Sequence, residues 1–230
     1  MIRLHLVVEG QTEETFVNRL LVEHFGQFNI VTDARCVETS RRQGRIYRGG
    51  VIDYQRVRND LSRWMKEDQN ANARFTTMLD LYALPEDFPR FAEAKQQSDP
   101  YGRVAMLEQA FAGDVGDRRF LAYLQLHEFE ALLLSDPAQF EERFSEHADN
   151  IRNLVNLVAQ FTSPELIDDD QYSAPSKRII KEIPEYEGAK VSAGPLVAQK
   201  IGVSAMRQKC QHFDEWLSKL ERLDTAAMLS

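Results

Sequence analysis

Apolar runs of strand length alternate with helically spaced apolar positions through the first half of the chain. The first run covers residues 2–8 and is followed directly by Glu9, a glycine and a helical pattern. That pattern continues over residues 12–25, which predicts an amphipathic helix with Thr12 as its N-cap. Residues 29–37 alternate well enough for a second strand. This strand-helix-strand opening predicts a parallel sheet with a right-handed crossover.

Two later apolar runs, residues 75–82 and 120–126, predict further strands. Helical spacing between the second and fourth strands predicts one helix that begins near Asp53 and another over residues 101–112 that stops at Gly113. The chain therefore continues to alternate strands with helices, which is the pattern of an α/β protein.

Strand signals fade in the last third of the chain. Apolar stripes at helical spacing run over residues 151–161 and 213–223, and such stripes are typical of helices packed on a core. Between them, Ser173 or Ser176 is placed to cap a helix that starts near Pro175.

These patterns together predict the fold class and the domains. We expect an α/β protein in which a mostly parallel sheet flanked by helices occupies residues 1–136. A helical C-terminal region, residues 137–230, should pack on this core. No internal repeat and no low-complexity segment interrupts the two parts.

Three of the predicted strands end in acidic residues. Glu9 follows the first apolar run and Asp80 closes the third, while Glu128 and Glu130 follow the fourth, beside His127. Ligands of open α/β proteins bind at the carboxyl ends of the strands. We therefore expect a functional site at this edge of the sheet.

Carboxylates without a set of Cys or His ligands suit hard divalent ions such as Mg²⁺ or Mn²⁺. Such an ion would ionise a water molecule and neutralise charge on a phosphodiester. The candidate metal ligands, in order of preference, are Glu9, Asp80, Glu128, Glu130 and Glu13. Glu128 is preferred to Glu130 because the two cannot face one way in an extended or helical segment. Glu13 is more simply explained as an acid of the first helical turn, and His127 as a cap to the strand, with metal ligand or general base as its alternatives.

The charge is unevenly distributed along the chain. The net charge of −8 argues against a protein that coats nucleic acid by bulk electrostatics. Residues 35–63, however, contain eight arginines and no lysine against three acids. Four of these arginines lie in the glycine-containing segment 40–50, which has no periodicity and reads as a loop. The predicted phosphate-binding residues there are Arg41, Arg42, Arg45 and Arg48, although a merely solvated loop is an equal reading.

Lys177 and Arg178 form a second basic pair, at the start of the helix predicted near Pro175. Lys177 could stabilise negative charge that develops on a phosphate during catalysis, and Arg178 could hold a nucleic-acid backbone. A solvated basic helix start explains the same pair without any catalytic role.

Several classes of protein are excluded or disfavoured by the sequence. No apolar run approaches the length of about 18 residues that a membrane span requires, and no secretory leader is recognisable, so we expect a soluble cytoplasmic protein. Cys36 and Cys210 lie far apart and should be core thiols rather than a disulfide or a zinc site. The chain also lacks the GxSxG motif of serine hydrolases and the HExxH motif of zinc hydrolases.

Five motifs, in order, resemble those of the bacterial family called domain of unknown function 4276. They are VEGQTEE, TTMLDLYALPEDFP, LQLHEFEALLLSDP, APSKRI and CQHFDEWL. The resemblance covers nearly the whole chain. It implies a Toprim-like core, the fold of topoisomerase-primase and overcoming-lysogenization-defect (OLD) nucleases. It also implies gene neighbourhoods with ABC-type ATPases in anti-phage defence.

The resemblance implies a role for two acids, and the sequence departs from the Toprim pattern at one position. Glu9 matches the first Toprim glutamate, and Asp80 matches the first aspartate of the Asp-x-Asp motif, whose second position is Tyr82 here. The first hypothesis is a Mg²⁺- or Mn²⁺-dependent nuclease in which Glu9, Asp80, Glu128 and Lys177 are catalytic, DNA or RNA is the substrate and an ABC-type ATPase is the partner. The missing aspartate motivates a second, a catalytically silent subunit that binds and regulates such an ATPase. A phosphotransfer enzyme is a third, and a homo-oligomer is left open.

Overall fold

A parallel sheet forms the centre of the fold. The computed structural model describes residues 1–42, 45–48, 53–167 and 173–223, with only the backbone for residues 38–42 and 45–48. Strand β1 (Ile2–Val8) lies between β2 (Ile30–Cys36) and β5 (Ala73–Asp80), parallel to both. Two short strands, β6 (Phe120–Leu121) and β7 (Leu124–Gln125), pair in parallel with successive parts of β5. The sheet order is β2-β1-β5-β6, with β7 also on β5, which confirms the predicted α/β class.

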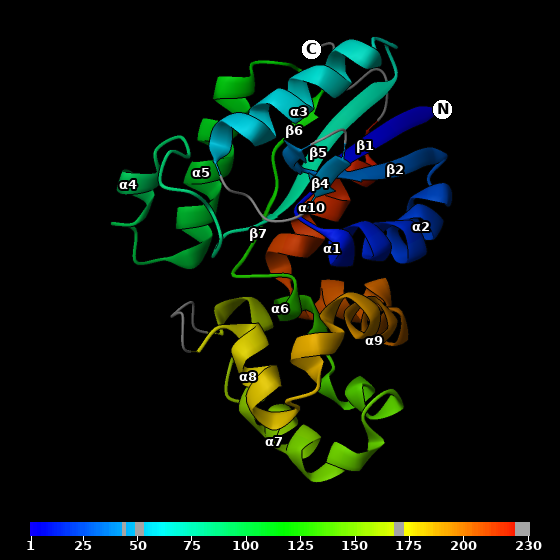
Figure 1. Cartoon of the computed structure of the whole chain (residues 1–230), viewed down its shortest axis with the longest axis vertical. Helices are drawn as coiled ribbons and strands as arrows, with labels where there is room; N and C mark the ends of the chain where they lie inside the picture. The colour runs from blue at the N-terminus through cyan, green and yellow to red at the C-terminus, as the bar shows by residue number, and fades with distance from the viewer. Residues whose placement is uncertain (43–44, 49–52, 168–172, 224–230) are drawn as a thin grey trace.

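Helices cover both faces of the sheet, so most of β1 is buried on both sides (Figure 1). One face carries a helical segment formed by α1 (Gln11–Phe16), the π-helical η1 (Val17–Leu21) and α2 (Val22–Gly26), together with α10 (Gln211–Glu221). The other face carries α3 (Tyr54–Glu67), α4 (Phe91–Ala94) and α5 (Pro100–Val115). Leu4 and Leu6 are fully buried in the first cluster, and Val7 is buried in the second.

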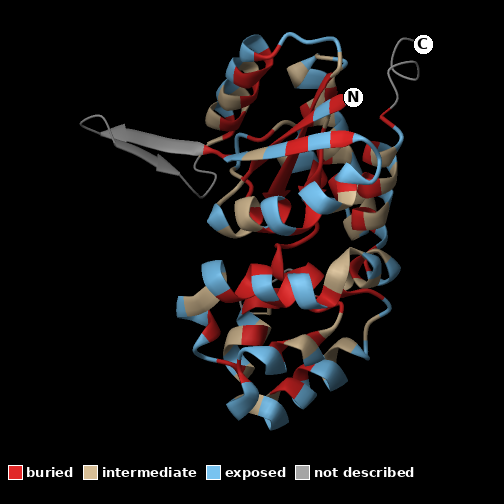
Figure 2. Cartoon of the chain, turned by 90° about the vertical axis from the view of Figure 1, so that its right-hand side faces the viewer, coloured by how far each residue is buried: buried red, intermediate tan, exposed pale blue. Residues whose placement is uncertain are grey.

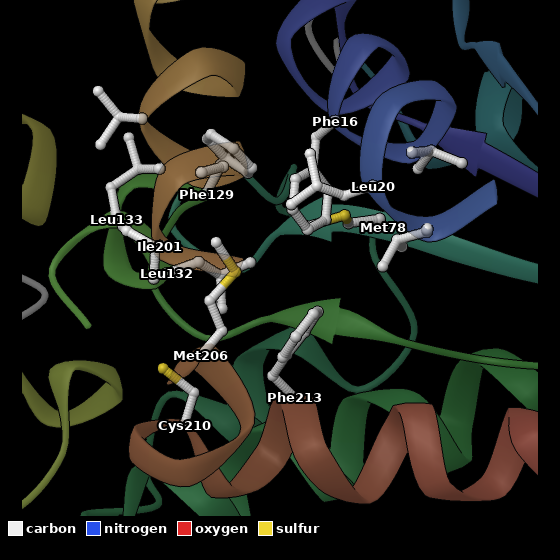
Figure 3. Close-up of a cluster of buried hydrophobic side chains, with 14 of the residues drawn as sticks. Phe16, Leu20, Met78, Phe129, Leu132, Leu133, Ile201, Met206, Cys210 and Phe213 are labelled. Carbon is white, nitrogen blue, oxygen red and sulfur yellow. The ribbon is translucent and has the colours of Figure 1, made fainter. Parts of the chain in front are cut away.

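The second half of the chain is helical, as predicted. Its elements are α6 (Glu130–Leu133), η2 (Pro137–Glu142), η3 (Ser145–His147), α7 (Ala148–Val158), η4 (Pro164–Leu166), α8 (Pro175–Glu182) and α9 (Tyr186–Lys209). Figure 2 shows buried residues running from the sheet into these helices. Figure 3 shows Phe16 and Phe213 from the sheet side near Phe129 and Met206 from the helical side. The domain boundary at residue 136 stays a prediction.

The last helix returns to the sheet and fixes its strand β5. The indole Nε1 of Trp216 donates a hydrogen bond to Thr76 Oγ1 at 3.0 Å, and the indole ring stacks on Tyr123 at 4.1 Å between centroids. Cys210, just before this helix, and Cys36 are both buried, as predicted for core thiols. Among the helices that the structure describes, none combines the length and apolar character of a membrane-spanning segment.

The predicted helix ends were partly wrong. Helix α1 begins after Gly10, not after Thr12, because the carboxylate of Glu13 accepts a hydrogen bond from Gly10 N at 2.9 Å and so stabilises the helix start. Helix α5 continues past Gly113 and ends at Gly116, whose φ of 65° is the left-handed conformation that glycine favours.

Two further predictions were corrected in irregular segments. Residues 38–42 and 45–48 form two paired antiparallel strands, β3 (Glu38–Arg42) and β4 (Arg45–Arg48), within the segment 40–50 that was predicted to be a loop. The two strands are joined by hydrogen bonds between backbone groups. A polar sequence can therefore form this pair of strands without the apolar alternation on which the prediction relied. The predicted strand 120–126 is two short strands, because Ala122 and Tyr123 interrupt the ladder.

Candidate functional site

The parallel register brings Glu9 and Asp80 together. Val8 lies opposite Met78 at the carboxyl ends of β1 and β5, so the next residues of each strand leave the sheet at the same edge. The backbone N–H of Glu9 donates to Met78 O at 3.1 Å, and the backbone N–H of Asp80 donates to Glu9 Oε2 at 3.1 Å. The two acids that the strand-end argument selected are therefore in direct contact.

A turn at His127 brings Glu128 and Glu130 to the same edge. The β5–β7 ladder continues beyond the strands, since Leu81 N donates to Gln125 O and Tyr82 N donates to His127 O, both at 2.9 Å. His127 then adopts a left-handed φ of 62°, which changes the direction of the chain. As a result Phe129 N donates to Asp80 Oδ1 at 3.0 Å.

Glu128 and Glu130 are both buried, and both face the other acids. The sequence argument for choosing between them assumed one extended or helical segment, and that condition is not met: the chain turns at His127, and α6 begins only at Glu130.

Each of these carboxylates has a defined partner. Glu128 Oε1 accepts a hydrogen bond from the backbone N–H of Ser176 at 2.5 Å, so it caps α8 in place of the predicted serines. Glu130 Oε1 accepts from the Tyr186 hydroxyl at 3.3 Å and lies 3.1 Å from Lys190 Nζ. Helix α8 is thereby joined to the end of the fourth predicted strand through one carboxylate.

Five acids share this edge of the sheet, and they repel one another. They are Glu9, Glu13, Asp80, Glu128 and Glu130, and the name acid cluster is used for them below. Burial is the largest cause that raises the pKa of Asp80 well above its ordinary value, followed by the charges of the other four acids. Burial and the charges of Glu128 and Glu130 also raise the pKa of Glu9, against the hydrogen bond from Asp80 N.

The pKa values of Glu13 and Glu128 are raised for the same reason. Burial raises the pKa of Glu13 to about 7, with further contributions from Glu9 and Glu130. Burial and the charge of Glu130 raise the pKa of Glu128, while Ser176 and Lys190 act in the opposite direction. Burial and mutual repulsion thus favour the protonated forms of Glu9, Glu13, Asp80 and Glu128, whereas a bound cation would favour their ionised forms.

The chemistry of the acid cluster fits a hard divalent ion, but the side chains do not form a ready coordination sphere. Within the described residues, no group of three or more His, Cys, Asp and Glu side chains is arranged so that it could hold a metal ion. The hydrogen bonds and ion pair given above involve one oxygen each of Glu9, Asp80 and Glu130. Metal binding would therefore require the carboxylate side chains to rotate and lose protons, but it would not require the backbone to move.

The predicted basic residues have different outcomes. The backbone of Arg41, Arg42, Arg45 and Arg48 lies in β3 and β4, and their side chains lie outside the described part of the structure. Lys177 is exposed in the first turn of α8, next to Ser176. Arg178 donates to Ser173 O at 2.6 Å and lies over the Phe161 ring at 5.9 Å, so its guanidinium is committed to local contacts.

Sequence reasoning missed two residues that contact the acid cluster. Tyr186 and Lys190 lie four residues apart on α9 and both reach Glu130. Their spacing on one helical face was the available signal, but nothing in the sequence connects that face to a strand end 56 residues earlier. Tyr82, at the position of the second aspartate, is 45% exposed.

A family model matches residues 8–221, and its description is domain of unknown function (DUF4276). The chain belongs to this family. The match confirms the resemblance found in the sequence and includes every member of the acid cluster. A comparison with curated proteins finds no match for this DUF4276 chain.

The DUF4276 chain is also similar to a solved structure, the C-terminal region of the Xanthomonas campestris pv. campestris OLD protein. The two are 15% identical, the match covers 96% of this chain and 98% of the other, and the TM-score is 0.32. The α/β class of the DUF4276 chain rests instead on its own strand order and register.

Proposed function

We propose that the acid cluster is the divalent-metal site of a nuclease that hydrolyses phosphodiester bonds. The observation that carries this proposal is the meeting of acids from three separated segments at the carboxyl edge of the sheet, where they raise one another's pKa. Buried like charges are costly unless something compensates them, and a cation would do so. Glu9, Asp80 and Glu128 are the proposed ligands, supported by Glu130 and Glu13.

A bound Mg²⁺ or Mn²⁺ would supply an ionised water and neutralise charge on the phosphate. The chain's own residues would orient the substrate around it. The exposed Lys177 at the start of α8 is one residue from the amide that binds Glu128, so its ammonium would reach a phosphate presented to the acid cluster. We assign backbone contacts of DNA or RNA to Arg41, Arg42, Arg45 and Arg48, and also to Arg178, which would have to exchange its contact with Ser173 O for a phosphate. We also propose a cytoplasmic role in anti-phage defence with an ABC-type ATPase partner.

A second candidate function is a catalytically silent subunit that binds and regulates such an ATPase. Two observations favour it. Tyr82 stands where the Toprim pattern has a second aspartate, and the described side chains contain no group already arranged to hold a metal ion. In that case the acid cluster would be a structural network of helix caps.

Metal titration and cleavage together decide between the two functions. Purified protein is titrated with Mn²⁺ by calorimetry and incubated with DNA and RNA, with and without the neighbouring ATPase. A nuclease should bind Mn²⁺ and cleave, and both signals should fall in Asp80→Asn and Glu9→Gln. Asp33→Asn, in the middle of β2 and outside the acid cluster, is the matched control. A silent subunit would bind Mn²⁺ no better than Asp80→Asn and would cleave nothing in any combination.

A further inference from the structure

A cavity of about 360 Å³ opens next to the acid cluster, on the other side of the two chain segments that form it. Its floor contains Leu81 and His127, each directly adjacent in sequence to a cluster acid, Asp80 or Glu128. The backbone hydrogen bond from Tyr82 N to His127 O closes this floor. Two of the residues that line the cavity are therefore sequence neighbours of proposed metal ligands.

The walls of the cavity combine aromatic and apolar surface. Tyr82 and the partly buried Phe91 of α4 line it, together with the buried Leu84 and Leu107. An exposed phenol beside a concave apolar surface is unusual for a side chain with only a packing role. Flat aromatic surface of this kind is what a nucleobase stacks on.

The rim of the cavity is basic. Lys95 and Arg103 line it, with Glu86 as the one acid among the lining residues. Lys95 Nζ lies 4.6 Å from the centre of the Phe91 ring and 4.0 Å from a carboxylate oxygen of the highly exposed Glu86. A base that stacks on Tyr82, or on Phe91 in place of the Lys95 ammonium, would have its phosphate near Lys95 and near Arg103, which also donates to Gln97 O.

We propose that this cavity binds one unstacked nucleobase of a single-stranded nucleic acid, next to the phosphodiester presented to the acid cluster. The inference rests on the proposed function for the role of that phosphodiester. Base binding itself depends only on the cavity residues. A paired base cannot enter such a pocket without leaving the stack, so the proposal makes single strands, ends or flipped nucleotides the preferred substrate class. It also gives Tyr82 a role of its own at the position of the absent aspartate.

The test measures binding separately from cleavage. A labelled 12-nucleotide single strand containing one 2-aminopurine is titrated into the full chain in EDTA, with fluorescence anisotropy for affinity and 2-aminopurine quenching for stacking. Tyr82→Ala and Phe91→Ala should each weaken binding about tenfold and abolish the quenching, whereas Tyr82→Phe should retain both. Lys95→Gln should weaken binding and lower the slope of log affinity against log salt by about 1. Phe28→Ala, a 43%-exposed aromatic on the far side of the sheet, is the control for surface aromatics.

The outcomes separate this inference from the proposed function. Equal affinity for the single strand and its duplex, or affinity and quenching unchanged in Tyr82→Ala and Phe91→Ala, overturns the base pocket even if Mn²⁺-dependent cleavage is found. Loss of quenching in these variants supports the pocket even if no metal binds and nothing is cleaved. Thermal unfolding of each variant identifies loss of fold, and Tyr82→Phe then serves as the deciding variant.

Discussion

Strand β1 carries a polar network at each end, and the two networks differ in charge balance. At its amino end, His5 bonds Asp33 Oδ1 at 2.6 Å and Asp68 Oδ2 at 2.7 Å, and Arg3 lies 3.0 Å from the same Asp68 oxygen. Burial tends to raise the pKa of Asp68, but the hydrogen bond from His5 and the charge of Arg3 keep it below its ordinary value. At its carboxyl end, Glu9 joins four other acids, and the pKa shifts run upward.

The difference indicates what each end does. Buried charges that are paired within the chain compensate part of one another's desolvation cost. Buried acids that raise one another's pKa cost stability, and such groups are typical of ligand-binding and catalytic sites. We therefore propose a structural role for the amino end of β1 and a ligand-binding role for its carboxyl end.

The most severe test removes one acid of the carboxyl end. Asp80→Asn and Glu9→Gln should each lower metal-dependent cleavage about 1,000-fold, because a ligand that neutralises charge at the reacting phosphate is lost. The same variants should unfold at equal or higher urea concentration than the wild type, since repulsion is relieved. Lower stability together with full activity would reverse the assignment of the two ends.

The amino end should respond in the opposite way. His5→Ala should lower the free energy of unfolding by about 3 kcal/mol, because it leaves the buried Asp68 without its histidine partner. Urea unfolding measures this loss, and cleavage by the folded variant should stay within twofold of the wild type. Arg152→Ala, which removes an exposed ion pair with Asp149, is the control and should change stability by less than about 0.5 kcal/mol.

The pH dependence of stability separates the two ends further. The folded pKa of Glu13 is about 7, against an ordinary value of 4.5, so the folded state binds more protons than the unfolded state between these values. Stability from this group is complete below pH 4.5 and is lost as the pH rises through 7. Raising the pH from 5 to 8 should cost the wild type about 2 kcal/mol more than Glu13→Gln, whose amide oxygen can still accept from Gly10 N. Equal slopes in urea titrations would place Glu13 outside the acid cluster.

The smallest expected effect comes from the packing behind the acid cluster. A Cβ at Gly194 on α9 would lie 3.2 Å from the Tyr186 hydroxyl and 3.4 Å from Phe129 Cε1, so Gly194→Ala should destabilise by about 1 kcal/mol and weaken Mn²⁺ binding a few-fold. Gly188→Ala on the same helix meets nothing within 4 Å and should stabilise slightly. Thermal unfolding and metal titration of the pair measure both effects. Identical behaviour of the two variants would show that this packing does not position the acids.

The strands and their final acids could be predicted because each leaves a local signal. Strands β1 and β5 are apolar runs that end in recognisable turns, and β2 alternates apolar with polar residues. The rule that parallel strands present ligands at one edge was then enough to select Glu9 and Asp80. The partners of the acids could not be predicted in this way. Tyr186 and Lys190 meet Glu130 through tertiary packing, which has no period in the sequence. The left-handed turn at His127 similarly has no glycine to mark it.

One hydrogen bond also connects the acid cluster to the start of helix α8. The carboxylate of Glu128 holds the first turn of α8 through Ser176 N, so a cation that recruits this carboxylate has to share it with that helix or release it. Binding of an ion at the proposed site would then weaken the hydrogen bond between Glu128 and α8, and a strong hydrogen bond would in turn lower the affinity for the ion. A spectroscopic label on the exposed Lys177 would report metal loading as a change in local order, without any substrate present.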